Sequence, residues 1–278
     1  MFRNMLVLIP SERPVRPVVD GSISLADACS AHIAALAIGY EPANIPIAAV
    51  VSPATPTIFE EERLRAMERA ETAINVFENE VRKTGLAYTC RTMSAIPAEA
   101  VAFASAAARL HDLTIVSQPD FERSTFDNDL STEILFQSGG PVLFMPHTFR
   151  GPLSPRRIGI CWDGSRLASR ALRDAMPLLK NAEAITIATI DDSETIPDEA
   201  SPERLVQHLA RAPLSAKIVK VCAQHSEIQP ALLSVAADQR LDLLVMGGYG
   251  HSRFQERFLG GVTREMLQSM PLPTLMSH

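Results

Sequence analysis

The strongest constraint on the fold is an internal repeat, because one order of apolar strands and helices occurs twice along the chain. In the second half the order is clear, since short apolar runs alternate with segments of helical periodicity. Such alternation predicts right-handed crossovers and a parallel sheet. We expect strands at 156–162, 184–190, 216–222, 241–246 and 273–277, and helices at 167–179, 202–212, 229–240 and 261–270.

The first half repeats this order with more irregular patterns. DLTIV (112–116) matches DLLVM (242–246), and EILFQSGGP (133–141) matches EMLQSMPLP (265–273), which pairs Glu133 with Glu265. Sequence similarity between two segments at a constant separation along the chain is typical of a repeated structural unit. We expect strands at 5–10, 45–51, 86–93, 112–117 and 141–145, and helices at 22–39, 57–84 and 97–110.

The predicted fold class is therefore α/β, with two tandem doubly wound domains that each contain a five-stranded parallel sheet. The segment 145–155, MPHTFRGPLSP, contains Pro and Gly and is typical of a linker. We place the domains at 1–148 and 155–278. A chain of 278 residues is long enough for two domains that each bury a core.

Composition and charge exclude several classes of protein. No apolar run approaches the roughly 20 residues of a membrane helix, and the N-terminus has the pattern of a first strand instead of a signal peptide. We therefore expect a cytoplasmic protein without membrane contact. The first half has 12 basic and 18 acidic residues and the second has 14 of each, so neither offers the basic surface that nucleic acids require. The four cysteines are scattered, and the sequence indicates no metal site.

A glycine-rich stretch near the C-terminus is the main candidate for a binding site. Gly247 and Gly250 follow the fourth strand of the second half, and Gly260 and Gly261 open the last helix. Glycines let backbone N–H groups approach an anion, and a helix N-terminus favours negative charge. The pattern suits a phosphate group at the carboxyl edge of the sheet. The alternative is that these glycines only form a tight turn and a helix start.

With Asp163-Gly164-Ser165 after the first strand, the spacing Gly247-x-x-Gly250, nine residues, then Gly260 resembles the universal stress protein family. The resemblance covers the chain as a tandem of two such domains, with an adenine nucleotide alpha hydrolase-like fold, but the motif is present only in the second. It implies that ATP, with or without Mg²⁺, binds with its adenosine at Asp163 and Thr189 and its phosphates on the glycine stretch. The site residues carried over are Asp163, Thr189, Gly247, Gly250, Gly260, Gly261 and Val262.

This sequence departs from the family pattern at Gly261, where Ser or Thr is usual. The backbone donor remains and the hydroxyl is lost, which Thr263 compensates only if its side chain turns toward the ligand. Two other residues have structural alternatives. Asp163 before Gly-Ser is typical of a turn or helix cap, and Trp162 on a strand is more typical of core packing than of stacking on adenine.

The first copy lacks the motif, so we expect it not to bind phosphate. Its aligned positions are Ser117, Asp120, Asn128 and Asp129, and its first strand runs into Pro10-Ser11. Carboxylates at that edge repel a polyphosphate. The acidic residues concerned are Asp120, Glu122, Asp127 and Asp129, and a DGS triplet appears only at Asp20.

In tandem members of the family the terminal strands of the two copies commonly pair, so the resemblance implies an intramolecular pseudo-dimer through 141–145 and 273–277. A homodimer and an unknown protein partner remain open. We expect a stress-response binding module that senses or holds an adenine nucleotide and has no rapid ATPase activity. The alternatives are a slow ATP-hydrolysing or phosphate-transferring enzyme and a ligand-free interaction protein.

Overall fold

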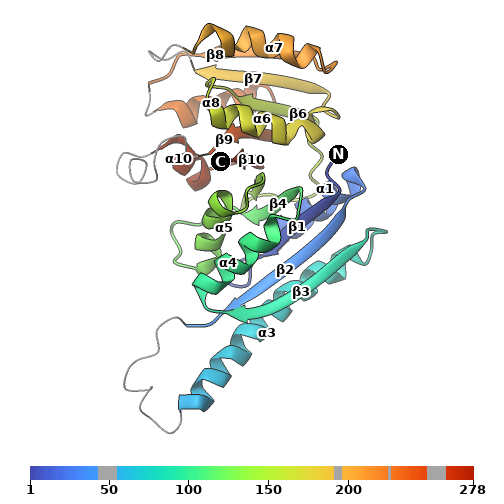
Figure 1. Ribbon diagram of the computed structural model, residues 1–278, viewed down its shortest axis with the longest axis vertical. Helices are drawn as coiled ribbons and strands as arrows, with labels where there is room; N and C mark the ends of the chain where they lie inside the picture. The colour runs from blue at the N-terminus through green and yellow to red at the C-terminus, as the bar shows by residue number, and fades with distance from the viewer. Residues whose placement is uncertain (43–54, 191–195, 225–226, 249–260) are drawn as a thin grey trace.

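A computed structural model of the protein describes residues 1–42, 55–190, 196–224, 227–248 and 261–278. Its strands form one continuous sheet in the order β3-β2-β1-β4-β5-β10-β9-β6-β7-β8 (Figure 1). The first half contributes β1 (Asn4–Ile9), β2 (His32–Tyr40), β3 (Tyr88–Ala95), β4 (Leu113–Ser117) and β5 (Val142–Met145). The second half contributes β6 (Arg157–Cys161), β7 (Ala184–Ile190), β8 (Ala216–Val221), β9 (Leu243–Gly247) and β10 (Thr274–Ser277).

Helices cover both faces of the sheet, and each face carries helices from both halves. One buried apolar cluster joins the sheet to α1 (Arg16–Cys29), α3 (Thr55–Val81), α6 (Arg166–Leu179) and α7 (Pro202–Ala210). A second cluster, on the other face, joins it to α4 (Pro97–Ala108), α5 (Phe126–Gln137), α8 (Ile228–Asp238) and α10 (Val262–Gln268). A short 3₁₀ turn, η1 (Asp198–Ala200), precedes α7.

The two halves meet through their last strands. β5 and β10 pair antiparallel, with Leu143 opposite Leu275, while the other strand pairs of the sheet are parallel. Both leucines are fully buried. The pairing expected for the two terminal strands is thus observed. Because the junction is antiparallel, the carboxyl ends of the strands in the two halves point to opposite edges of the sheet.

The expected helix at 22–39 is wrong, because two elements share this stretch. α1 ends at Cys29, and β2 begins at His32 and pairs in parallel with β1. Ser30 makes the turn between them in the left-handed region, with φ of 52°. β2 is buried over most of its length, and a continuous apolar run cannot be distinguished from a buried helix by periodicity. The strand expected at 45–51 lies outside the described residues. β2 occupies the place in the sheet next to β1 that this strand was expected to take.

α3 differs strongly in length from its counterpart in the second half. It has 27 residues, whereas the helix at the corresponding place in the second half, α7, has nine. Figure 1 shows α3 extending past the end of the sheet. Its charged residues form exposed pairs such as Arg65 with Glu62, which indicates a solvated helix face.

Candidate functional site at the carboxyl edge of the second half

The order of the strands gives each half a point at which successive connections leave to opposite faces of the sheet. In the second half, β6 lies between β7 and β9, so the chain leaves the carboxyl ends of β6 and β9 toward opposite sides. Open α/β sheets bind ligands at such a point. The equivalent point in the first half lies between β1 and β4. These two places, here called the second rim and the first rim, allow a direct comparison.

Asp163 lies at the second rim, in the turn from β6 to α6, and is exposed. One of its carboxylate oxygens accepts the backbone N–H of Ser165 at 2.9 Å, and the Ser165 hydroxyl accepts the N–H of Ala168 at 3.1 Å. Gly164 between them has φ of +73°, which favours glycine. Asp163 therefore stabilises the turn, as the structural alternative predicted, and its carboxylate also faces solvent at the place where an adenosine ligand is expected.

Trp162 packs in the core and does not form an open stacking surface. Its ring is 8% exposed, and its indole N–H donates to the carbonyl of Ala200 at 2.7 Å. A Cβ on Gly164 would lie 2.7 Å from Ile196 and 3.3 Å from Ala200. The segment around η1 therefore lies against the Asp163 turn and borders the second rim.

Thr189 lies near the end of β7 and is 4% exposed. Within the part of the chain that the structure describes, its Oγ1 atom finds no hydrogen-bond partner. A buried hydroxyl without a partner carries a desolvation cost of about 1–3 kcal/mol, and such groups in folded proteins usually bond to water or a ligand. Thr189 therefore offers an unused polar group beside the β6 turn.

Gly247 ends β9, and its lack of a side chain has a packing reason. A Cβ there would lie 2.8 Å from the backbone of Leu167 and Ala168, in the first turn of α6. This glycine brings the end of β9 close to α6, whatever else it does. Gly250 and Gly260 lie outside the described residues.

α10 carries the remaining predicted residues. Gly261 is its N-cap, with extended backbone (φ −105°, ψ 148°) and no side chain to bond the first turn. Val262 is half-buried, and Thr263 is 4% exposed. The structure thus brings Asp163, Thr189, Gly247 and the start of α10 to one edge of the sheet in the second half. The Thr263 side chain is buried in the protein.

The first rim is occupied by side chains of the protein itself. Asp127, in the first turn of α5, is 5% exposed and accepts the N–H of Glu12 at 2.8 Å and the hydroxyl of Tyr40 at 3.0 Å. The Glu12 carboxylate in turn accepts the N–H of Phe126, the first residue of α5, at 2.9 Å. The helix N-terminus, which favours an anion, is therefore already bonded to a carboxylate of the chain.

A buried arginine completes this network. Arg13 is 9% exposed, and its guanidinium donates to Asn128 Oδ1 at 2.7 Å and to the His147 ring at 2.7 Å. Asn128 also accepts the N–H of Asp120 at 2.8 Å. Burial lowers the pKa of His147, and the neighbouring Arg13 lowers it further, so the ring is suited to accept from the guanidinium.

Burial also raises the pKa of Asp127 to about 6 and that of Tyr40 well above its usual value. The hydrogen bonds that the Asp127 carboxylate accepts oppose this shift, but the loss of solvation is larger. The absence of phosphate binding in the first half remains a prediction, and the structure changes its inferred basis at Asp127 alone. This carboxyl lies inside a bonded network, whereas Glu122 and Asp129 are exposed at the surface as inferred.

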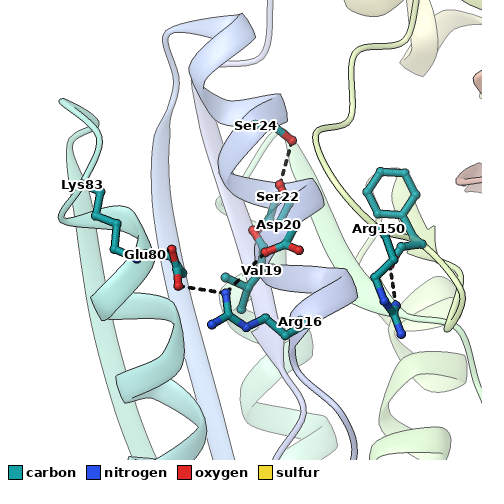
Figure 2. Close-up of polar contacts among 9 residues, drawn as sticks. Arg16, Val19, Asp20, Ser22, Ser24, Glu80, Lys83 and Arg150 are labelled. Atoms are coloured by element: carbon teal, nitrogen blue, oxygen red, sulfur yellow. Dashed lines mark hydrogen bonds and ion pairs between the residues drawn. The ribbon is translucent and has the colours of Figure 1, made fainter.

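Sequence reasoning missed this network. Arg13, Tyr40 and His147 come from three distant segments, and nothing in their local patterns marks them as neighbours. The DGS triplet at Asp20 carries no rim function, since it lies inside α1. Figure 2 shows Arg16 of the same helix between Asp20 and Glu80, and its guanidinium is 2.8 Å from Glu80. A groove between α1 and α3 is lined by Asp20, Glu80 and Lys83, among others, and Lys83 pairs with Glu80 in it. It lies away from both rims.

Comparison with known proteins now identifies the second half. Residues 155–278 match the model of the universal stress protein family. This part of the chain is a universal stress protein domain. No curated protein matches the sequence. Within the described residues, no helix is long and apolar enough to cross a membrane, and no group of at least three His, Cys, Asp or Glu side chains is placed to hold a metal ion.

Solved structures extend the likeness to the whole chain. A universal stress protein from Archaeoglobus fulgidus is 15% identical, with a TM-score of 0.73, and the alignment covers 98% of this chain and 97% of that one. A functionally unknown protein from Pseudomonas aeruginosa is 15% identical, with a TM-score of 0.59 and coverage of 99% and 92%. The cytoplasmic domain of a prokaryotic cation chloride cotransporter is 12% identical, with a TM-score of 0.52 and coverage of 99% and 95%. At these identities the likeness shows the shared fold, and the fold alone does not assign a function.

Proposed function

We propose that the second half binds an adenine nucleotide, ATP, at the second rim, and that the protein is a cytoplasmic stress-response module that senses this ligand and transmits its presence to a protein partner. Asp163 and Thr189 would bond to the adenosine part. Backbone N–H groups of Gly247, Gly250, Gly260, Gly261 and Val262 would bond to the phosphates, with any Mg²⁺ bound to the phosphate oxygens. The universal stress protein domain supports this proposal.

The observation that carries the proposal is the buried Thr189 hydroxyl without a partner among the described residues. It lies on the strand next to the exposed Asp163 turn, because Trp162 N–H bonds to the carbonyl of Ala188 at 2.8 Å. A ligand that bonds to this hydroxyl removes its desolvation cost. The first half has no hydroxyl at the corresponding strand position, where the register places Ala37.

The described side chains of the second rim favour binding over catalysis. Phosphoryl transfer needs a residue that orients or activates a nucleophile. Among the described residues of this rim the acidic side chain is Asp163, and it already accepts the Ser165 N–H. We therefore expect ATP to be held without rapid hydrolysis.

The test begins with freshly purified protein, which is denatured so that its supernatant can be analysed by anion exchange for ATP or ADP. Millimolar ATP should also raise the unfolding temperature, since a ligand at 100 times its Kd adds about 2.7 kcal/mol of stability. A time course with MgATP then measures any turnover. Absence of both co-purified nucleotide and thermal shift would refute the proposal.

A pair of variants locates the site. Gly250→Asp places a carboxylate in the glycine stretch and should abolish ATP binding while the circular dichroism spectrum stays unchanged. The control is Asp120→Asn, at the aligned position of the first half, which should leave ATP affinity unchanged. Equal affinity in Gly250→Asp and wild type would place the nucleotide elsewhere.

A further inference from the structure

The C-terminal end of α10 is held by a side chain from the other half of the molecule. Gln118 follows β4 in the first half and is 4% exposed. Its Nε2 donates to the carbonyl oxygen of Leu267 in α10 at 2.8 Å. Carbonyls in the last turn of a helix have no partner inside the helix, so this bond satisfies a buried acceptor.

The Gln118 side chain is fixed at both ends of its amide. Its Oε1 accepts the backbone N–H of His147 at 3.3 Å, and its own backbone N–H donates to Met145 at 2.8 Å. The oxygen can only accept and the nitrogen can only donate, so these partners define one orientation of the amide. His147 also contacts Arg13, which links this position to the network of the first rim.

The repeat gives this contact a counterpart with different chemistry. The strand registers place Gly248 of the second half at the position of Gln118. Gly248 lies against Leu135 of α5, where an added Cβ would be 3.0 Å from the leucine side chain, and Leu135 aligns with Leu267. The two equivalent positions therefore make different contacts: Gln118 donates a hydrogen bond to α10, whereas Gly248 makes an apolar contact with α5.

α10 depends on such contacts because it has seven residues, and helices this short gain their stability from packing. It carries Val262 of the proposed ligand site and, next to it, Thr263. A second glutamine, Gln229 in α8 of the same half, donates to the carbonyl of Ser269 at 3.0 Å just beyond the helix, but this contact is exposed. The buried bond to this end of α10 comes from Gln118.

We propose that Gln118 is a positioning residue for the nucleotide site, supplied by the half that lacks the glycine motif. By bonding to Leu267 it sets the position of α10, and thereby of Val262 and Thr263 relative to the second rim. This inference rests on the proposed function of that rim. It gives the first half a role in ligand affinity although its own rim is occupied.

The test compares two glutamines changed in the same way. Gln118→Glu keeps the length of the side chain and its bond to His147, but a carboxylate cannot donate to Leu267. We expect Gln118→Glu to weaken ATP binding about tenfold, whereas Gln229→Glu should change it less than about twofold, because the exposed carbonyl of Ser269 can bond to water. Isothermal titration calorimetry of full-length protein at 10 °C, where circular dichroism shows both variants folded, measures the two values of Kd.

Each outcome has one meaning. If wild-type protein does not bind ATP, the proposed function fails and this inference fails with it. If wild type binds ATP and the two variants have equal Kd, Gln118 only stabilises the fold and this inference alone is overturned. Should Gln118→Glu not fold, Gln118→Met, which fills the same volume without a donor, replaces it with the same expected loss of affinity.

Discussion

The two rims of this protein arise from the same unit and differ in what satisfies their polar groups. At the first rim, Asp127, Arg13 and Glu12 bond to one another's backbone or to neighbouring side chains, and Asp127 and Arg13 are buried. At the second rim, Asp163 is exposed and the Thr189 hydroxyl has no partner among the described residues. The protein's own side chains therefore fill the first rim, whereas the second rim keeps an exposed carboxylate and a buried hydroxyl that a ligand could bond to.

The largest expected effect concerns the filled rim. Arg13→Met removes a buried guanidinium that bonds to Asn128 and His147, and should lower the free energy of unfolding by about 3 kcal/mol, since hydrogen bonds to charged groups are strong. Urea denaturation measures this loss. The matched control is Asp163→Asn at the second rim, which should cost less than about 1 kcal/mol because the carboxylate is exposed. Equal losses would mean that the first rim is not a bonded core.

The filled rim should also make stability depend on pH. Burial raises the pKa of Asp127 from 3.8 to about 6, so the folded state holds a proton that the unfolded chain has released. The free energy of unfolding should fall as the pH rises from about 4 to about 6, by up to about 3 kcal/mol from this group.

Denaturation at several pH values checks this slope. Asp127→Asn should remove this contribution. Tyr40→Phe should move it to higher pH, because the Tyr40 hydroxyl bonds to the carboxylate and favours its ionised form. A slope that is the same in wild type and Asp127→Asn would contradict the assignment.

The open rim should respond in ligand affinity instead of stability. Thr189→Val keeps the shape of the side chain and removes the hydroxyl, so ATP affinity should fall about tenfold, equivalent to about 1.4 kcal/mol. The stability without ATP should rise slightly, because a buried group without a partner is removed. Calorimetric titration measures the Kd, and the reciprocal control Ala37→Thr in the first half should leave it unchanged. Undiminished affinity in Thr189→Val would break the contrast between the rims.

The smallest effect concerns the helices that leave the two rims. The Ser165 hydroxyl caps α6, whereas α1 has Val15 at its N-cap and no side-chain bond there. Ser165→Ala should therefore lower the free energy of unfolding by about 1 kcal/mol, and Ser165→Asp should largely retain it. Val15→Ser is the control in the first half. A stability gain of similar size there would show that α1 is limited by its missing cap.

Much of the fold could be predicted because strands and helices in the second half have distinct periodicities. The apolar β-branched run at 184–190 became β7 without a change of bounds. The error at 22–39 arose where local signals were weak, since β2 has several alanines and its preceding turn uses Ser30 in the left-handed region where glycine is the usual signal. Its pairing with β1 on one side and β3 on the other distinguishes this stretch from a helix.

Only those parts of the candidate site that depend on local sequence signals could be predicted. Asp163 could be placed because it directly follows a recognisable strand, and the contact of Gly247 with α6 could not, because it depends on the approach of distant backbone. Gly250 and Gly260 remain predictions. Arg13 and Gln118 escaped notice, and Asp127 was expected to face the solvent, because the partners of these residues are 29 to 149 residues away along the chain.

The sequence by itself determined the repeated α/β unit and the half that carries the glycine motif, because periodicity and motifs are local in the chain. The family resemblance implied that the two terminal strands pair, and only the structure showed that they pair antiparallel. The tertiary structure alone decided which polar groups are buried, which are bonded to one another and which remain for a ligand. Satisfaction of a polar group depends on the atoms that surround it in space, and the order of residues does not specify them.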